Sequence, residues 1–61
     1  MWRLLIIDDD INILQRMRKA LPWHELQVEL VGTAMDGIEG LQLIKELEVD
    51  IVITDIYICL I

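Results

Sequence analysis

The chain has 61 residues, of which 56% are apolar, and eleven acidic residues against five basic ones give it a net charge of −6. This length allows one domain, residues 1–61, and a chain of about 60 residues buries only ~60% of its unfolded surface, so a lone copy would be marginally stable. An acidic surface repels phosphate backbones, which excludes nucleic acid as an expected partner.

The location follows from the apolar runs and from the single cysteine. No run approaches the ~20 residues of a membrane-spanning helix, so we expect no membrane contact. Three aspartates, Asp8 to Asp10, cut off the short apolar run at the amino terminus, which is unlike a signal peptide. Cys59 cannot form an internal disulfide, which suggests a reducing compartment. We expect a cytoplasmic protein.

The first half of the chain predicts a strand and a helix. Residues 2–7 are expected to form a strand that is buried on both faces, because residues 4–7 are all apolar. Asp10 is expected to cap a helix over residues 11–21, which Pro22 ends. The apolar stripe of this helix consists of Ile11, Leu14, Met17 and Leu21.

The second half repeats this alternation. Residues 28–34 predict a second strand, and Asp36 with Glu39 resembles a capping box that begins a second helix, ending near Leu47. The expected inner face of that helix consists of Ile38, Leu41, Ile44 and Leu47. Residues 51–54 predict a third strand. The strand–helix–strand–helix–strand order predicts an α/β fold with a parallel sheet and right-handed crossovers.

Acidic residues follow two of these strands. Asp8 and Asp9 end the first strand, and Asp55 ends the third. Ligands of parallel α/β sheets bind beyond the carboxyl ends of the strands, and neighbouring strands lie ~4.8 Å apart. Crowded carboxylates repel one another unless a cation binds them, and oxygen ligands suit Mg²⁺. A carboxylate beside such a cation can attack phosphorus and form an aspartyl phosphate.

The chain resembles the receiver domain of bacterial two-component response regulators over about residues 2–56. The resemblance rests on four stretches: Leu4–Asp10, Gly32–Ala34, Asp36–Gly37 and Asp50–Ile56. It implies a flavodoxin-like half-domain with strand order 2-1-3. It also implies that Asp55 accepts a phosphoryl group from a histidine kinase, and that the protein is not an enzyme acting on other substrates. Mg²⁺ would be held directly by Asp9 and through water by Asp8, with Asp55 and the Tyr57 carbonyl as further ligands.

The chain also departs from the family pattern. Ile58 and Cys59 stand where the family has Met and Pro, and the family fold has five strand–helix pairs against two pairs and a strand here. The resemblance therefore implies a truncated receiver with impaired phosphorylation.

The third strand would be an edge strand in such a half-domain. Bare edges template pairing with other chains, and residues 56–61 have high β-propensity without charge or proline. We expect this strand to run on through the tail and to pair with a second copy. The result would be a homodimer through Ile51–Ile61 with strand order 2-1-3-3′-1′-2′. The Tyr57 carbonyl would then be used in the ladder.

Other interpretations stay open. The chain could be a purely structural, self-assembling half-fold, or a degenerate receiver that sequesters a kinase or another receiver by completing its fold. Asp8, Asp9 and Asp55 could be caps and solvated strand ends. His24 is expected to be an exposed loop residue, and Cys59 a small buried residue at an interface.

Overall fold

A computed structural model describes residues 1–54 and 58–60 of the chain. Its elements are β1 (Trp2–Ile7), α1 (Ile11–Ala20), β2 (Val28–Ala34), α2 (Gly37–Glu46), β3 (Ile51–Thr54) and β4 (Ile58–Leu60). The first three strands have the predicted bounds, and both helices end one residue before the predicted end. Neither helix of this described part is long and apolar enough to cross a bilayer.

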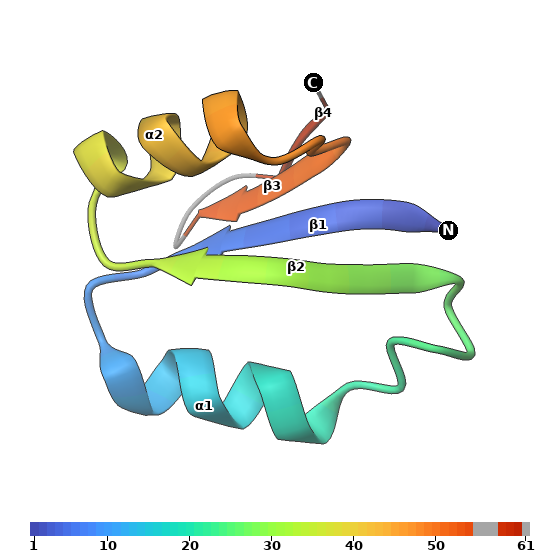
Figure 1. Ribbon diagram of the computed structural model, residues 1–61. Coiled ribbons are helices and arrows are strands. Elements are labelled where there is room, and N and C mark those ends of the chain that lie inside the picture. Colours follow the sequence, from blue (N-terminus) through green and yellow to red (C-terminus); the bar gives the residue numbers. More distant parts are fainter. Residues whose placement is uncertain (55–57, 61) are drawn as a thin grey trace.

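The strands form one sheet in the order β2-β1-β3-β4. β1 pairs in parallel with β2 and with β3, and each crossover carries one helix. α1 covers one face of the sheet and α2 covers the other, as Figure 1 shows. The predicted α/β half-domain with a parallel 2-1-3 sheet is therefore confirmed.

The core facing α1 is built on the alternation of β1. Leu4 and Ile6 point to this face and, with Leu14 of α1, are at most 4% exposed. Met17 and Trp23 pack against them, and the Trp23 indole N–H donates to the Arg18 carbonyl at 3.2 Å. The predicted stripe of α1 is only partly correct, because its two ends, Ile11 and Leu21, are 50% and 39% exposed.

The predicted inner face of α2 is also partly wrong. Ile38 and Leu41 are exposed at 77% and 53%, whereas the side chains packed on the sheet are Leu43, Ile44 and Leu47. The reason is Gly40, which is buried against Ile7 and Ala34. The small residue lets the helix approach the sheet closely. The inner stripe therefore begins at Gly40 and continues at the i+3, i+4 and i+7 positions.

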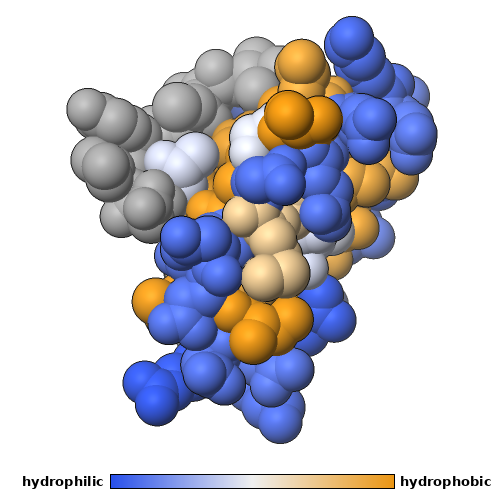
Figure 2. All heavy atoms as spheres, turned by 90° about the vertical axis from the view of Figure 1, so that its left-hand side faces the viewer, coloured by the Kyte–Doolittle hydropathy of each residue, from blue (hydrophilic) through white to orange (hydrophobic). Residues whose placement is uncertain are grey.

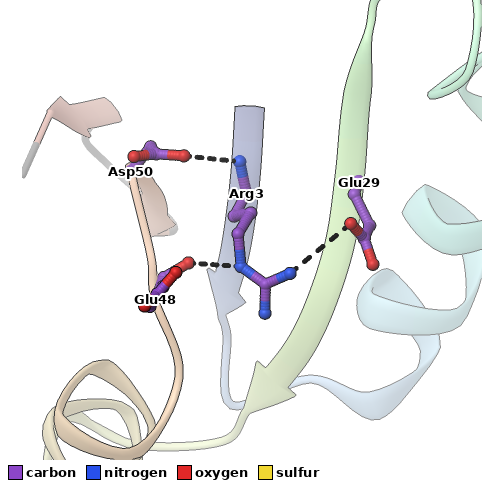
Figure 3. A network of polar contacts seen from close by, with 4 residues as sticks. All are labelled: Arg3, Glu29, Glu48 and Asp50. Atoms are coloured by element: carbon purple, nitrogen blue, oxygen red, sulfur yellow. Dashed lines mark hydrogen bonds and ion pairs between the residues drawn. The ribbon is translucent and has the colours of Figure 1, made fainter. Parts of the chain in front are cut away.

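A polar network closes the amino-terminal edge of the sheet. The Arg3 guanidinium donates to the Glu48 carbonyl at 2.6 Å and lies 3.5 Å from the Glu29 carboxylate (Figure 3). The Arg3 main-chain N–H donates to the Asp50 carboxylate at 2.9 Å. One β1 residue thereby connects β2 to the segment that leads into β3.

The expectation that β3 runs on through the tail as one strand is wrong, and pairing with a second copy stays a prediction. Residues 58–60 form a separate strand, β4, which returns antiparallel along β3. Their register partners are Leu60 with Ile51, Cys59 with Val52, and Ile58 with Ile53. The chain thereby pairs the edge of β3 with its own next segment. Such pairing avoids the loss of translational and rotational freedom that association of two molecules requires.

Candidate functional site

The carboxyl ends of β1, β2 and β3 lie level with one another. Ile7 is the register partner of both Ala34 and Thr54, and the Asp8 N–H donates to the Ala34 carbonyl at 2.9 Å. The paired residues Ile7 and Thr54 are thus followed in the sequence by Asp8 and Asp55. The structure confirms that β1 and β3, the strands that precede these acids in the sequence, are direct neighbours. Asp55 and Tyr57 themselves lie outside the described residues.

Asp8 is the buried acid of this edge. It is only 8% exposed, and its Oδ1 atom accepts a hydrogen bond from the Asp10 N–H at 2.9 Å. Asp9, the next residue, is exposed. Burying a carboxylate is unfavourable unless partners compensate for its lost hydration. Asp8 is therefore not a solvated strand end. The exposure of Asp9 agrees with that interpretation.

Asp10 caps α1, as predicted. Its Oδ1 atom accepts from the Asn12 N–H at 2.9 Å, and its carbonyl accepts from the Leu14 N–H at 3.2 Å. The side chain satisfies one of the N–H groups that a helix start leaves without an intrahelical partner. Asp10 therefore joins the capped helix start to the Asp8 carboxylate through its own main chain.

A cavity of about 370 Å³ lies between α1 and the ends of β1 and β3. Its lining is mostly apolar, and Asp8 and Thr54 contribute the polar atoms at the carboxyl end; the full set is Ile6, Ile7, Asp8, Ile13, Met17, Ile53 and Thr54. Figure 2 looks onto this edge of the molecule and shows hydrophilic residues beside apolar ones. The Asp8 carboxylate thus borders an open, mostly apolar cavity at the carboxyl end of the sheet.

The available donors fit Mg²⁺ in kind. Asp8 and Asp9 supply only carboxylate oxygens, which is the ligand type that Mg²⁺ prefers, and this ion commonly uses one or two carboxylates with water. Within residues 1–54 and 58–60, no group of three or more His, Cys, Asp or Glu side chains is placed to hold a metal. The two remaining predicted ligands, Asp55 and the Tyr57 carbonyl, are outside that part of the chain.

The other reactive side chains lie away from this edge or are not described. His24 is exposed in the turn before β2, where its carbonyl accepts from the Gln27 N–H at 3.0 Å. The expected exposed loop position is confirmed. Cys59 belongs to β4 and is the register partner of Val52.

The sequence alone did not reveal the role of the Asp10 main chain. Three consecutive aspartates before a helix predict a cap at the third, but they do not show that the N–H of the third binds the carboxylate of the first. The available signal was the spacing of two residues, because aspartate side chains often accept from the main-chain N–H two positions later.

Comparison with known proteins gives matches to response regulators. Over 56 residues, 92% of its length, the chain is 39% identical to an uncharacterized response regulatory protein of Staphylococcus epidermidis strain ATCC 12228. A second such protein, from S. epidermidis strain RP62A, is 38% identical, and the transcriptional regulatory protein HptR of Staphylococcus aureus is 36% identical. The chain spans 22% of the length of each relative. No protein-family model and no solved structure matches it. The predicted resemblance to response regulators is confirmed at this level.

Proposed function

We propose, from the similarity of the chain to response regulatory proteins over 92% of its length, that it carries part of a receiver-type phosphoacceptor site. Asp55 accepts the phosphoryl group, and a histidine kinase supplies it. The proposal implies a cytoplasmic protein that turns over no substrate other than its own phosphoryl donor.

One observation carries this proposal: Ile7 and Thr54 are register partners, and a buried aspartate follows Ile7. The acceptor and the cation ligands must lie at the same edge, because the cation neutralises charge that develops during transfer. In the transfer, an Asp55 carboxylate oxygen forms a bond to phosphorus while the bond from phosphorus to the donor nitrogen breaks. The imidazole of the donor histidine leaves and retains that electron pair.

Mg²⁺ fits the donor atoms of this edge. Asp8, Asp9, Asp55 and the Tyr57 carbonyl would hold it, and when bound it would stabilise negative charge on the phosphoryl oxygens. Asp8 is only 8% exposed, and its Oδ1 atom is held by the Asp10 N–H. Asp9 is exposed and can meet an incoming cation without desolvation of a buried group.

We also propose that phosphorylation of this chain is slow. The support comes from β4, which begins three residues after Asp55 and pairs back along β3. The connection from Asp55 to a paired strand is therefore short. Binding of Mg²⁺ by the Tyr57 carbonyl would compete with the pairing of β4 along β3. Ile58 and Cys59 replace the Met and Pro of the family pattern, and a proline there would fix φ at about −65°, away from the extended value of a paired strand.

The test is incubation of the chain with acetyl phosphate, followed by intact-mass measurement. The proposal predicts slow, Mg²⁺-dependent addition of one phosphoryl group to the wild type and none to Asp55→Asn. Labelling that is unaffected by chelation of Mg²⁺ would refute the cation role. Equal labelling of Asp55→Asn would refute the acceptor. Labelling of the chain that is complete at the first time point after mixing would refute slow transfer.

Self-association is a second part of the proposal. The edge of β3 is paired with β4, so a homodimer through residues 51–61 would use the outer edge of β4. Exposed apolar side chains, among them Ile38 and Leu41, support association of copies, and they also favour the alternative of a purely structural half-fold. Sedimentation equilibrium tests this point: a dimer is expected at micromolar concentration, and a folded monomer throughout would contradict it.

A further inference from the structure

We propose that Asp10 is a positioning residue for the cation site, acting through Asp8. Its main-chain N–H fixes the Asp8 carboxylate, and its side chain keeps that N–H in place by capping α1. This inference rests on the proposed function, because it concerns the same cation, and it adds a residue that the ligand set does not include.

The first step is the orientation of Asp8. In the described part of the chain, the Asp10 N–H is the donor that reaches the Asp8 carboxylate, and it binds Oδ1 at 2.9 Å. This bond fixes Oδ1 toward the turn, and Oδ2 accepts no hydrogen bond from the described residues and can face a cation or its bound water. Asp8 is 8% exposed, so other atoms of the chain cover most of its surface.

The second step is the fixation of the donor. Asp10 has extended backbone angles, φ −101° and ψ 107°, and its side chain and carbonyl accept from the N–H groups of Asn12 and Leu14. Without the cap, the Asn12 N–H binds water instead of the Asp10 side chain, and the first turn of α1 frays. The turn at Asp10 is then no longer fixed. The Asp10 N–H would lose its fixed direction, and Asp8 would lose its orientation.

The expected size comes from outer-sphere partners of metal ligands in general. Groups that orient a ligand change metal affinity by about 10- to 100-fold when they are removed. A cap that served α1 alone would change helix stability and leave the cation affinity of the folded chain unaltered. Affinity therefore distinguishes positioning from capping.

The chain offers two matched controls. Asp10→Asn removes the same charge as Asp10→Ala but keeps an oxygen that can cap α1. Asp36→Ala removes one charge and one helix cap, since the Asp36 Oδ1 atom accepts from the Glu39 N–H at 2.8 Å, but Asp36 has no hydrogen bond to Asp8 among the described residues. A loss specific to Asp10→Ala thus cannot come from charge or from capping in general.

The experiment is calorimetric titration of Mg²⁺ into the wild type, Asp10→Ala, Asp10→Asn and Asp36→Ala, with folding verified by circular dichroism. We expect about a tenfold weaker Kd for Asp10→Ala, and values within about threefold of the wild type for both controls. Equal affinity of Asp10→Ala and Asp10→Asn overturns the inference while the cation site stands. No binding by the wild type overturns both.

A second measurement needs no metal. Hydrogen exchange of the Asp10 amide is measured by NMR in Mg²⁺-free wild type and in Asp8→Ala. We expect at least tenfold faster exchange of this amide in Asp8→Ala, with the amides of α2 unchanged as the internal control. Unchanged exchange at Asp10 shows that Asp8 does not hold this N–H, and it overturns the inference whatever the cation does.

Discussion

Arg3 and Asp50 exchange two hydrogen bonds across a separation of 47 residues. The Arg3 N–H donates to the Asp50 Oδ2 atom at 2.9 Å, and the Asp50 N–H donates to the Arg3 carbonyl at 2.8 Å. The pair sets the start of β3 beside β1, and the register from Leu4–Ile51 to Ile7–Thr54 follows from it. The alignment of the carboxyl ends of β1 and β3 therefore depends on these two hydrogen bonds at the amino-terminal edge, which we call the Arg3–Asp50 lock.

Replacing Asp50 should destabilise the fold. Asp50→Ala leaves the partly buried Arg3 N–H without its acceptor, and we expect a loss of about 1–2 kcal/mol in the free energy of unfolding, measured with urea. Asp50→Asn keeps an acceptor oxygen and should lose less. Glu29→Ala removes a half-exposed ion pair with Arg3 and should cost under ~1 kcal/mol. A loss in Glu29→Ala that equals or exceeds the loss in Asp50→Ala would contradict the lock.

Gly40 should not tolerate a methyl group. A Cβ atom there would lie 3.0 Å from the Ile7 Cγ1 atom and still closer to the Ile7 Cδ1 atom. Overpacking costs about 1–3 kcal/mol, and the gain in helix propensity of about 1 kcal/mol offsets part of it, so Gly40→Ala should be net destabilising by about 1 kcal/mol. Urea unfolding checks this.

Two variants control the interpretation of Gly40→Ala. A Cβ atom added at Gly37 would meet nothing within 4 Å, so Gly37→Ala should be neutral or stabilising by up to ~1 kcal/mol. Adding Ile7→Val to Gly40→Ala removes the Cδ1 atom and should recover part of the loss. Stabilisation by Gly40→Ala alone would show that α2 does not pack as closely as the structure has it.

Much of the fold could be predicted because consecutive apolar residues and caps act locally. The run at residues 4–7 and the caps Asp10 and Asp36 mark the strand and helix starts, and the structure has them there. The face of α2 could not be predicted from apolar residues alone. Its inner stripe includes Gly40, whose contribution is the absence of a side chain, and this depends on how closely the helix approaches Ile7.

The tail was mispredicted for a different reason. High β-propensity in residues 58–60 correctly indicates a strand, but propensity does not say which edge a strand pairs with or in which direction. Similarly, the acids after β1 and β3 could be assigned to one edge from the order of elements. The difference between buried Asp8 and exposed Asp9 could not, because burial depends on how the surrounding elements pack at this edge.

The pairing of β4 with β3 can be tested by a cross-link. Val52 and Cys59 are register partners, and side chains directly opposite in antiparallel strands have Cβ atoms about 4.5–5.5 Å apart. Val52→Cys should therefore form a disulfide with Cys59 within one chain under mild oxidation. Non-reducing electrophoresis and intact mass distinguish this product from a cross-linked dimer.

Ile53→Cys provides the matched comparison for the cross-link. Its register partner is Ile58, and adjacent residues of a strand point to opposite faces, so it should cross-link to Cys59 far more slowly. A predominantly intermolecular disulfide from Val52→Cys would instead support pairing of β3 with a second copy. It would support the strand order 2-1-3-3′-1′-2′ and contradict the pairing of β3 with β4 within one chain.

Disruption of β4 should increase the rate of phosphoryl transfer to Asp55. Cys59→Pro fixes φ at about −65° in the middle of this three-residue strand, away from the extended value, and should weaken its pairing with β3. We expect acetyl phosphate to label this variant several-fold faster than the wild type in Mg²⁺, measured by intact mass over time. Cys59→Ser, which keeps the N–H, should label at the wild-type rate. No acceleration by proline would mean that β4 does not limit the reaction.

The site of the phosphoryl group is the measurement that tests the central claim most directly. The wild-type chain is labelled with acetyl phosphate in Mg²⁺, digested under mild acid, and mapped by tandem mass spectrometry. The account predicts the group on Asp55 alone, beside the edge at which Ile7 and Thr54 pair. A phosphoryl group on Asp8, Asp9 or Asp10, or none after prolonged incubation of the folded chain, would contradict it.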